Sequence, residues 1–295
     1  MKGTTMQIRR QTTARLVALG TTALVVGTLG GTSTAAVASP AAHTRTSSTV
    51  PVVVARMSSS AIRLSVGHDM RAGLTIFSVR SSKGTHALQI ARLHRGYTIQ
   101  QAMTDLSKAF RGNVQAVRRV DHRITFRGGT ATSPAAPGRF AVTLRAGRYL
   151  LVDQDSNATM WLRVHGTVPA RPPVKHAGNV TVFTYGFATA PVTLPAAGWL
   201  RMSNHSDQPH FVEINRVKNG TTAAMVRRYM KGGAQGRPSW GLRLSTNSGV
   251  MSPNTSEAMR INMPAGEYLL ACWWPDDETG MPHALMGMWK LVHLK

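Results

Sequence analysis

The segment LLACWWPDDETGMPHALMGMWKLV, residues 269–292, contains the single cysteine of this 295-residue chain, Cys272. His283 and Met288 follow it in the same segment. A single cysteine cannot form an internal disulfide, so this thiol needs another role. The apolar run before Cys272 is typical of a buried strand, and the run from 289 is typical of a closing strand. The segment therefore predicts two strands and also contains the residues of a candidate chemical site.

Another candidate ligand, His210, lies upstream in the segment SNHSDQPHFVEI (residues 203–214). Two imidazoles, a thiolate and a thioether are the donors of a type 1 copper site. Soft sulfur donors favour Cu(I), whereas imidazoles suit both oxidation states of copper. His210, Cys272, His283 and Met288 are therefore the predicted metal ligands, for one copper ion.

The chain contains two copies of one unit. AGLTIFSVRSSKGTHALQIARLHRGYT (72–98) aligns with AGWLRMSNHSDQPHFVEINRVKNGTT (197–222), and LRAGRYLLVDQ (144–154) aligns with MPAGEYLLACW (263–273). The order of these blocks is the same in both halves, which indicates a tandem duplication. We expect one unit over residues 61–166 and another over 179–295. The Pro-rich, basic stretch TVPARPPVKHAG (167–178) is the expected linker.

Within each unit, alternation of apolar and polar residues predicts short antiparallel strands, as in HALQIARL and HFVEINRV. Short strands at regular spacing favour a β-sandwich. One helical insert is expected in each unit, IQQAMTDLSKAF after Thr98 and AAMVRRYMK after Thr221 or Thr222. The predicted fold is all-β, with two tandem sandwiches whose helices cover a sandwich edge.

The N-terminus has the pattern of an export signal. Four basic residues precede an apolar run (16–31), and small residues then lead to an Ala-Val-Ala cleavage pattern at residues 36–38. We expect a cleaved signal peptide over residues 1–38 and a flexible leader over 39–60. No later stretch is long and apolar enough to span a membrane. The mature protein is therefore predicted to be secreted or extracytoplasmic.

Two motifs in the second unit resemble the cupredoxin family of type 1 copper proteins. They are N-x-x-x-x-P-H (204–210) and C-x-x-P…M-P-H-x-x-x-G-M (272–288). The resemblance implies Greek-key β-sandwiches, with His210, Cys272 and His283 as equatorial ligands and Met288 as the axial ligand. The gap between Cys272 and His283 is long for that family. Because it contains three consecutive acidic residues (276–278), we expect this loop to splay outward.

The first unit lacks the ligand set. His86 aligns with His210, but Asp153 aligns with Cys272, and the residues that follow are too few for a His and Met loop. We therefore expect residues 61–166 to be a degenerate cupredoxin-like domain, now structural or partner-binding, without a blue-copper site.

Two alternatives stay open at this level. Met281, Met286 and Met288 with His283 form a sulfur-rich group that can hold Cu(I) loosely for transfer. Alternatively, Cys272 is a small buried hydrophobe, and the protein is a metal-free secreted binding module. Without the four basic residues of the signal region, the formal net charge falls from +23 to +19, which would draw such a module to anionic cell-wall polymer or a protein partner.

Composition and motifs narrow the function classes. The basic residues are scattered without a dense run, which argues against a specific nucleic-acid site. Hydrolase motifs such as G-x-S-x-G and H-E-x-x-H are absent, and so are the His-x-His pairs of a trinuclear copper cluster. We therefore predict that the protein is not an enzyme. We expect electron transfer with a redox partner protein, or copper handling, at the cell surface.

Overall fold

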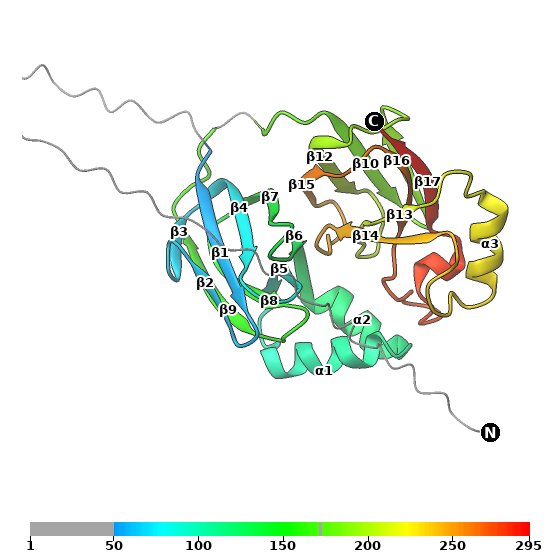
Figure 1. Ribbon diagram of the computed structural model, residues 1–295. Coiled ribbons are helices and arrows are strands. Elements are labelled where there is room, and N and C mark those ends of the chain that lie inside the picture. Colours follow the sequence, from blue (N-terminus) through cyan, green and yellow to red (C-terminus); the bar gives the residue numbers. More distant parts are fainter. Residues whose placement is uncertain (1–49, 171–172) are drawn as a thin grey trace, which may run out of the picture. The chain divides into compact units, whose positions relative to one another are not determined.

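The computed structural model describes residues 50–170 and 173–295 (Figure 1). The predicted signal peptide and residues 39–49 of the predicted leader lie outside the described residues. The leader prediction is wrong at its end, because Val52–Ser58 forms strand β1, which pairs with two other strands. Its alternating buried and exposed side chains explain why it joins the core. Among the described residues, no helix has the length and apolar character needed to cross a membrane.

The first half of the described chain is a β-sandwich. One layer consists of β2 (Ala61–Leu64), β1, β4 (Gly73–Ser81) and β7 (Gly138–Leu144). The other layer consists of β3 (Asp69–Arg71), β9 (Thr159–His165), β8 (Gly147–Asp153), β5 (His86–Leu93) and β6 (Ile124–Thr132). Phe77 and Phe140 lie opposite each other in register and stack with their ring centroids 5.2 Å apart in the core between the layers.

The second half repeats this arrangement. One layer consists of β11 (Gly186–Ala190), β10 (Gly178–Phe183), β12 (Ala197–Asn204) and β15 (Ser256–Asn262). The other layer consists of β14 (Gly241–Asn247), β13 (Glu213–Val217), β16 (Gly266–Ala271) and β17 (Trp289–Leu294). Both halves begin with a hairpin whose first strand also pairs in parallel with a later strand, β1 with β4 and β10 with β12. The predicted tandem β-sandwich fold is confirmed.

The two halves share one sheet. Strand β7 of the first half pairs with β15 of the second half through residues 139–141 and 258–260. This pairing joins the two layers into one eight-stranded sheet. Side chains from both halves also enter one apolar cluster, in which Phe126 of the first half contributes beside Trp274 of the second. The halves are therefore packed as one body and are not connected only by the linker.

The helical inserts agree with the sequence in part. Helix α1 (Ile99–Ala109) begins after Thr98, whose side chain and that of Gln101 form a capping box. Helix α3 (Ala223–Lys231) begins after Thr222 and ends at Gly232. The prediction of one helix in the first unit is wrong, because a second helix, α2 (Val114–Arg123), follows it. Asn113 caps α2, and buried residues in α2 include Ala116, Val117 and Val120.

Glycines permit the close approach of the two halves. The Gly249 N–H donates to the Gly129 carbonyl (2.9 Å), and the Gly128 N–H donates to the Val250 carbonyl (3.0 Å). The carboxylate of Glu257, a buried residue, accepts from the N–H groups of Gly129 (2.7 Å) and Gly249 (3.2 Å). A Cβ atom at Gly249 would collide with the backbone of Gly129. The contact therefore requires glycine at this position.

Replacement of this glycine tests the contact. We expect Gly249→Ala to lower the free energy of unfolding by about 3 kcal/mol, because the collision is with backbone that cannot move aside cheaply. Gly186→Ala is the matched control, since a Cβ atom there meets nothing within 4 Å. The control should change stability by less than about 0.5 kcal/mol. Urea denaturation measures both, and equal effects would contradict this account of the interface.

Candidate metal centre

Strand pairing brings three predicted ligands together. Cys272 follows β16 directly, and His210 precedes β13, the neighbour of β16 in the same sheet. The backbone of His210 is fixed by two hydrogen bonds with Met251, at 3.0 and 2.7 Å. His283 opens a short 3-10 helix, η1 (His283–Met286), and its N–H donates to the Trp274 carbonyl (2.9 Å). Each ligand is thus held by backbone structure on a different segment.

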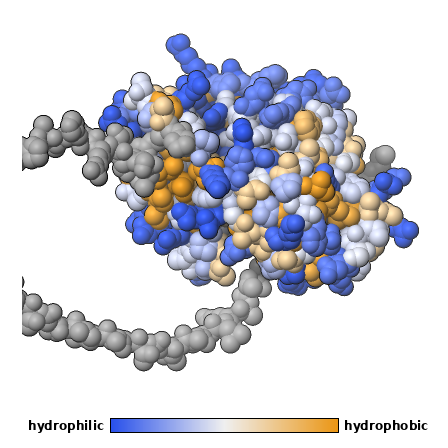
Figure 2. Space-filling model, turned by 90° about the horizontal axis from the view of Figure 1, so that it is seen from above, coloured by the Kyte–Doolittle hydropathy of each residue, from blue (hydrophilic) through white to orange (hydrophobic). Residues whose placement is uncertain are grey.

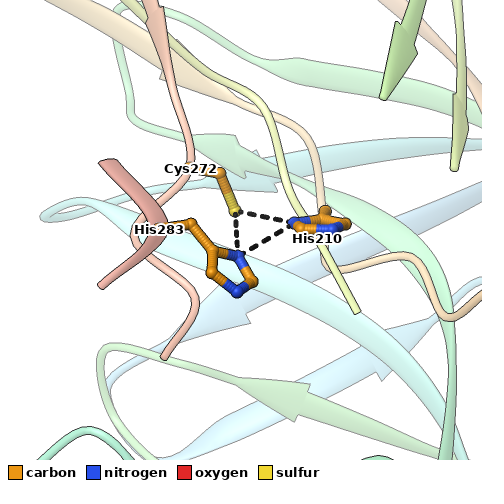
Figure 3. Close-up of side chains that lie close together, drawn as sticks. All are labelled: His210, Cys272 and His283. Atoms are coloured by element: carbon orange, nitrogen blue, oxygen red, sulfur yellow. Dashed lines mark hydrogen bonds between the residues drawn. The ribbon is translucent and has the colours of Figure 1, made fainter. Parts of the chain in front are cut away.

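The three donor atoms form a small triangle (Figure 3). Cys272 Sγ lies 3.5 Å from His210 Nδ1 and 3.9 Å from His283 Nδ1, and the two Nδ1 atoms lie 3.1 Å apart. The point equidistant from these atoms is about 2 Å from each, which is a typical metal–imidazole bond length. At most 1% of each residue is exposed. Among the described residues, His210, Cys272 and His283 form the group of metal-binding side chains whose ligand atoms lie close enough together to hold one ion.

Hydrogen bonding sets the tautomer of His283. Its Nε2 lies 2.9 Å from Gln208 Oε1, while Gln208 Nε2 donates to the carboxylates of Asp276 (3.3 Å) and Asp277 (2.9 Å). Because those carboxylates accept, the Gln208 oxygen faces the imidazole and accepts from Nε2–H. Neutral His283 therefore presents an unprotonated Nδ1 to the triangle, as a metal ligand must.

Burial keeps both imidazoles neutral. Burial, together with a smaller effect of the neighbouring His283, lowers the pKa of His210 to about 2. Burial also lowers the pKa of His283 to about 4, although the negative charges of Asp276 and Asp207 oppose this shift. His210 Nε2 is buried and has no hydrogen-bond partner among the residues that the structure describes. At neutral pH neither histidine has to lose a proton before it binds a cation.

Burial has the opposite consequence for the thiol. It raises the pKa of Cys272 to about 12, while the backbone N–H groups of Phe211 and Trp274 oppose the shift. A metal ion must therefore displace the thiol proton. Those two N–H groups are in place to stabilise the thiolate that results.

The long loop is folded inward, so the prediction that it splays outward is wrong. Asp276 is buried and accepts hydrogen bonds from the N–H and hydroxyl groups of Thr279 (both 2.7 Å), from the Tyr185 hydroxyl (2.7 Å) and from Gln208. Burial alone would raise the pKa of Asp276, but these hydrogen bonds outweigh it and lower the pKa well below its ordinary value. Glu278 remains exposed. The first acidic residue therefore closes the loop instead of opening it.

Met288 lies where the loop returns to the sheet. It is fully buried, its N–H donates to the His283 carbonyl (3.0 Å), and its carbonyl accepts from the Cys272 N–H (3.4 Å). Met288 also belongs to the apolar cluster that contains Cys272. Its role as the axial ligand stays a prediction. Met281, in contrast, is 46% exposed, so the methionines of this loop differ in environment.

In the first half, a hydrogen-bonded His–Asp pair occupies the positions that align with His210 and Cys272. His86 Nδ1 lies 2.6 Å from Asp153 Oδ2, and both residues are buried. His86 Nε2 faces the Lys83 carbonyl at 3.0 Å, and Ser156 donates to the same carboxylate. The aligned positions 86 and 153 thus meet in space, as 210 and 272 do, but they satisfy each other.

The sequence prediction missed the residues that support the ligands. Gln208 orients His283, Asp276 organises the loop, and the Tyr185 ring lies edge-on to His283 with centroids 5.5 Å apart. The spacing D-x-x-T from Asp276 to Thr279 is a turn signal that identifies Asp276 from sequence. Gln208 and Tyr185 have no comparable signal, because their contacts depend on tertiary structure.

Comparisons with known proteins concern the fold. No family model matches the chain, and no curated protein matches it. Auracyanin A, a "blue" copper protein from Chloroflexus aurantiacus, is similar over 40% of this chain and 99% of its own, at 17% identity and a TM-score of 0.23. A multicopper oxidase is similar over 83% of this chain and 88% of its own (10% identity, TM-score 0.24). The copper nitrite reductase of Nitrosomonas europaea is similar over 83% and 94% (9% identity, TM-score 0.23).

The resemblance to cupredoxins is confirmed. The protein has two tandem cupredoxin-like β-sandwiches, and the second contains a His–Cys–His cluster whose donors fit copper. The prediction that the protein is not an enzyme is overturned. The structures that are similar over most of the chain include the oxidase and the nitrite reductase, which are enzymes.

Proton release tests the assigned protonation states. Between about pH 6 and 8 the imidazoles are already neutral and the thiol is still protonated, so binding of one copper ion should release one proton. Copper affinity should therefore rise about tenfold per pH unit in this range. Calorimetry in buffers of different ionisation enthalpy counts the protons. Cys272→Ser should release none, and release of none by the wild type would contradict the pKa order.

Asp276→Asn tests the closed loop. Asparagine has one acceptor oxygen instead of two, so we expect the free energy of unfolding to fall by about 2 kcal/mol at pH 7. The lowered pKa of Asp276 stabilises the fold above the unfolded pKa of about 4, and this stabilisation is lost as the pH falls below it. The difference between wild type and variant should therefore shrink in acid. Glu278→Gln, at an exposed position, should have the same free energy of unfolding as the wild type at pH 7 and in acid.

Proposed function

We propose that the protein binds one type 1 copper ion, with His210, Cys272 and His283 as equatorial ligands and Met288 as the axial ligand. The observation that carries this proposal is the triangle of two Nδ1 atoms and one Sγ atom, all buried and facing one another. Bound copper would supply a centre that cycles between Cu(II) and Cu(I). The residues would hold that centre in a dry, closed position.

We further propose electron transfer as the role of this centre, in preference to copper delivery. A delivery site must release its metal, which requires a loose or exposed ligand set. Here the predicted ligands are at most 1% exposed, and Gln208 restrains His283 from outside the triangle. Fixed ligands that do not rearrange favour a change of oxidation state without loss of the ion.

The setting is proposed to be extracytoplasmic, with a redox partner protein. The N-terminal signal pattern supports export, and the net charge of +23 supports an acidic partner or an anionic cell-wall polymer. Figure 2 shows hydrophilic side chains over much of one face, interrupted by apolar patches. An encounter with an acidic partner on such a surface would weaken as salt is added.

Copper titration of wild type and Cys272→Ser tests the copper site. We expect the wild type to develop an intense visible thiolate-to-copper band that ascorbate bleaches, since the thiolate is the donor that produces it. Cys272→Ser should lose the band and at least about 100-fold in copper affinity, more than is typical when an outer-shell partner is removed. Absorption spectroscopy and competition with a chelator provide these measurements.

Met281→Leu is the matched control, since Met281 lies on the same loop but is exposed. It should retain the band and the affinity. If Cys272→Ser kept wild-type affinity and Met281→Leu lost it, the methionine-rich group would be the copper site and the ligand set proposed above would be wrong.

A further inference from the structure

A cavity of about 630 Å³ lies between the two halves of the described chain. Strands β5, β6 and β8 of the first half form one wall, helix α1 contributes Met103 and Leu106, and its C-cap residue Phe110 adds to them. Residues of the second half, including Phe211 and the pair Trp273–Trp274, line it as well. Small-molecule sites in proteins range from about 300 to 1,000 Å³. The cavity is therefore large enough for a ligand of about two fused rings.

Aromatic side chains dominate part of the lining. Trp274 meets Phe126 edge to face with ring centroids 5.3 Å apart, and it meets Phe110 in the same way at 5.6 Å. Phe110 is 56% exposed although it contacts a buried tryptophan. The exposed ring of Phe110 and the half-buried rings of Phe211 and Trp273 line the cavity and offer ring surface to a guest. They favour a planar aromatic molecule over a flexible chain.

The polar groups of the cavity favour a hydrogen-bond donor. Glu213 lines the cavity, and its Oε2 accepts from Trp273 Nε1–H at 2.6 Å. A carboxylate has about four acceptor positions, so it can accept a further O–H or N–H from a ligand. A negatively charged ligand would be repelled by the same group. The side chains of Asn247 and Gln154 add neutral polar contacts.

We propose that this cavity binds a neutral aromatic small molecule that carries a hydroxyl or amino group. Its rings would pack against Phe110 and Phe211, and its O–H or N–H would donate to Glu213. The site adjoins the metal cluster through the chain itself, because Phe211 follows His210 and the two tryptophans follow Cys272. The proposal does not depend on copper, since none of the three clustered ligands lines the cavity.

Calorimetric titration of the full-length protein with 2-naphthol tests this proposal. We expect one molecule to bind per chain. We expect 2-naphthoate to bind at least about tenfold more weakly, because its carboxylate faces Glu213. Glu213→Gln keeps the shape of the side chain and removes its charge. This variant should weaken 2-naphthol binding about tenfold and narrow the difference between the two probes.

Leu106→Trp fills the cavity from α1 and should abolish binding. Thr104→Trp adds the same side chain at an exposed position of the helix outside the cavity lining, and it should bind as the wild type does. Unchanged thermal stability of both variants identifies loss of binding as occlusion. If Leu106→Trp does not fold, the binding of 2-naphthol and 2-naphthoate by Glu213→Gln and wild type still tests the cavity proposal.

The same titrations of copper-free protein and of Cys272→Ser separate this proposal from the proposed function. Binding of 2-naphthol by Cys272→Ser supports the cavity even if no copper binds. A wild type that forms the copper band but does not bind 2-naphthol retains the proposed function and overturns the cavity proposal. Equal binding by Leu106→Trp and wild type would also overturn it.

Discussion

The pairing of β13 with β16 is the constraint on which the metal centre depends. It fixes the segment after His210 beside the end of β16, so that Sγ of Cys272 and Nδ1 of His210 approach to 3.5 Å. Only His283 then has to be supplied by a loop. Gln208 and Asp276 hold that loop through hydrogen bonds that fix its conformation and the tautomer of His283. The sheet therefore sets two donors and the loop network sets the third, and loss of either would open the triangle.

The first half also supports the Cys272–His283 loop, so it contributes to the metal centre although it lacks the ligand set itself. Arg118 of α2 donates to the Asp277 carbonyl (2.8 Å), and Asp121 accepts from Trp274 Nε1–H (3.3 Å). Gly112, between α1 and α2, lies so close to Gly280 that a Cβ atom on Gly280 would collide with it. The two helices thus press on the outer side of the Cys272–His283 loop. The insert that we expected to cover a sandwich edge braces the loop of the other half.

The sequence contained the fold because the pattern of each unit is local and occurs twice. Alternation predicted β5 and β13, Thr98 identified the start of α1, and the choice between Thr221 and Thr222 located the start of α3 to within one residue. The clustering of His210, Cys272 and His283 was also predictable, since each stands in a recognisable motif. The contact between the halves was not predictable. Gly249 shows its importance only once the backbone of Gly128 and Gly129 is known to pass it, and Gly128 only once the Glu257 side chain is known to lie against it. Likewise, the three acidic loop residues suggested repulsion, whereas tertiary hydrogen bonds bury the first of them.

The two halves satisfy a buried histidine in different ways. A buried imidazole must be satisfied. In the first half, each ring nitrogen of His86 faces an oxygen acceptor, one from Asp153 and one from Lys83. In the second half, His210 Nδ1 lies beside Cys272 Sγ and His283 Nδ1, and within the described part of the chain its Nε2 has no partner. The first cluster is complete from the chain alone. The second places two imidazole nitrogens and the sulfur of a protonated thiol around one point, and a cation that displaces the thiol proton would complete it as Asp153 completes the first.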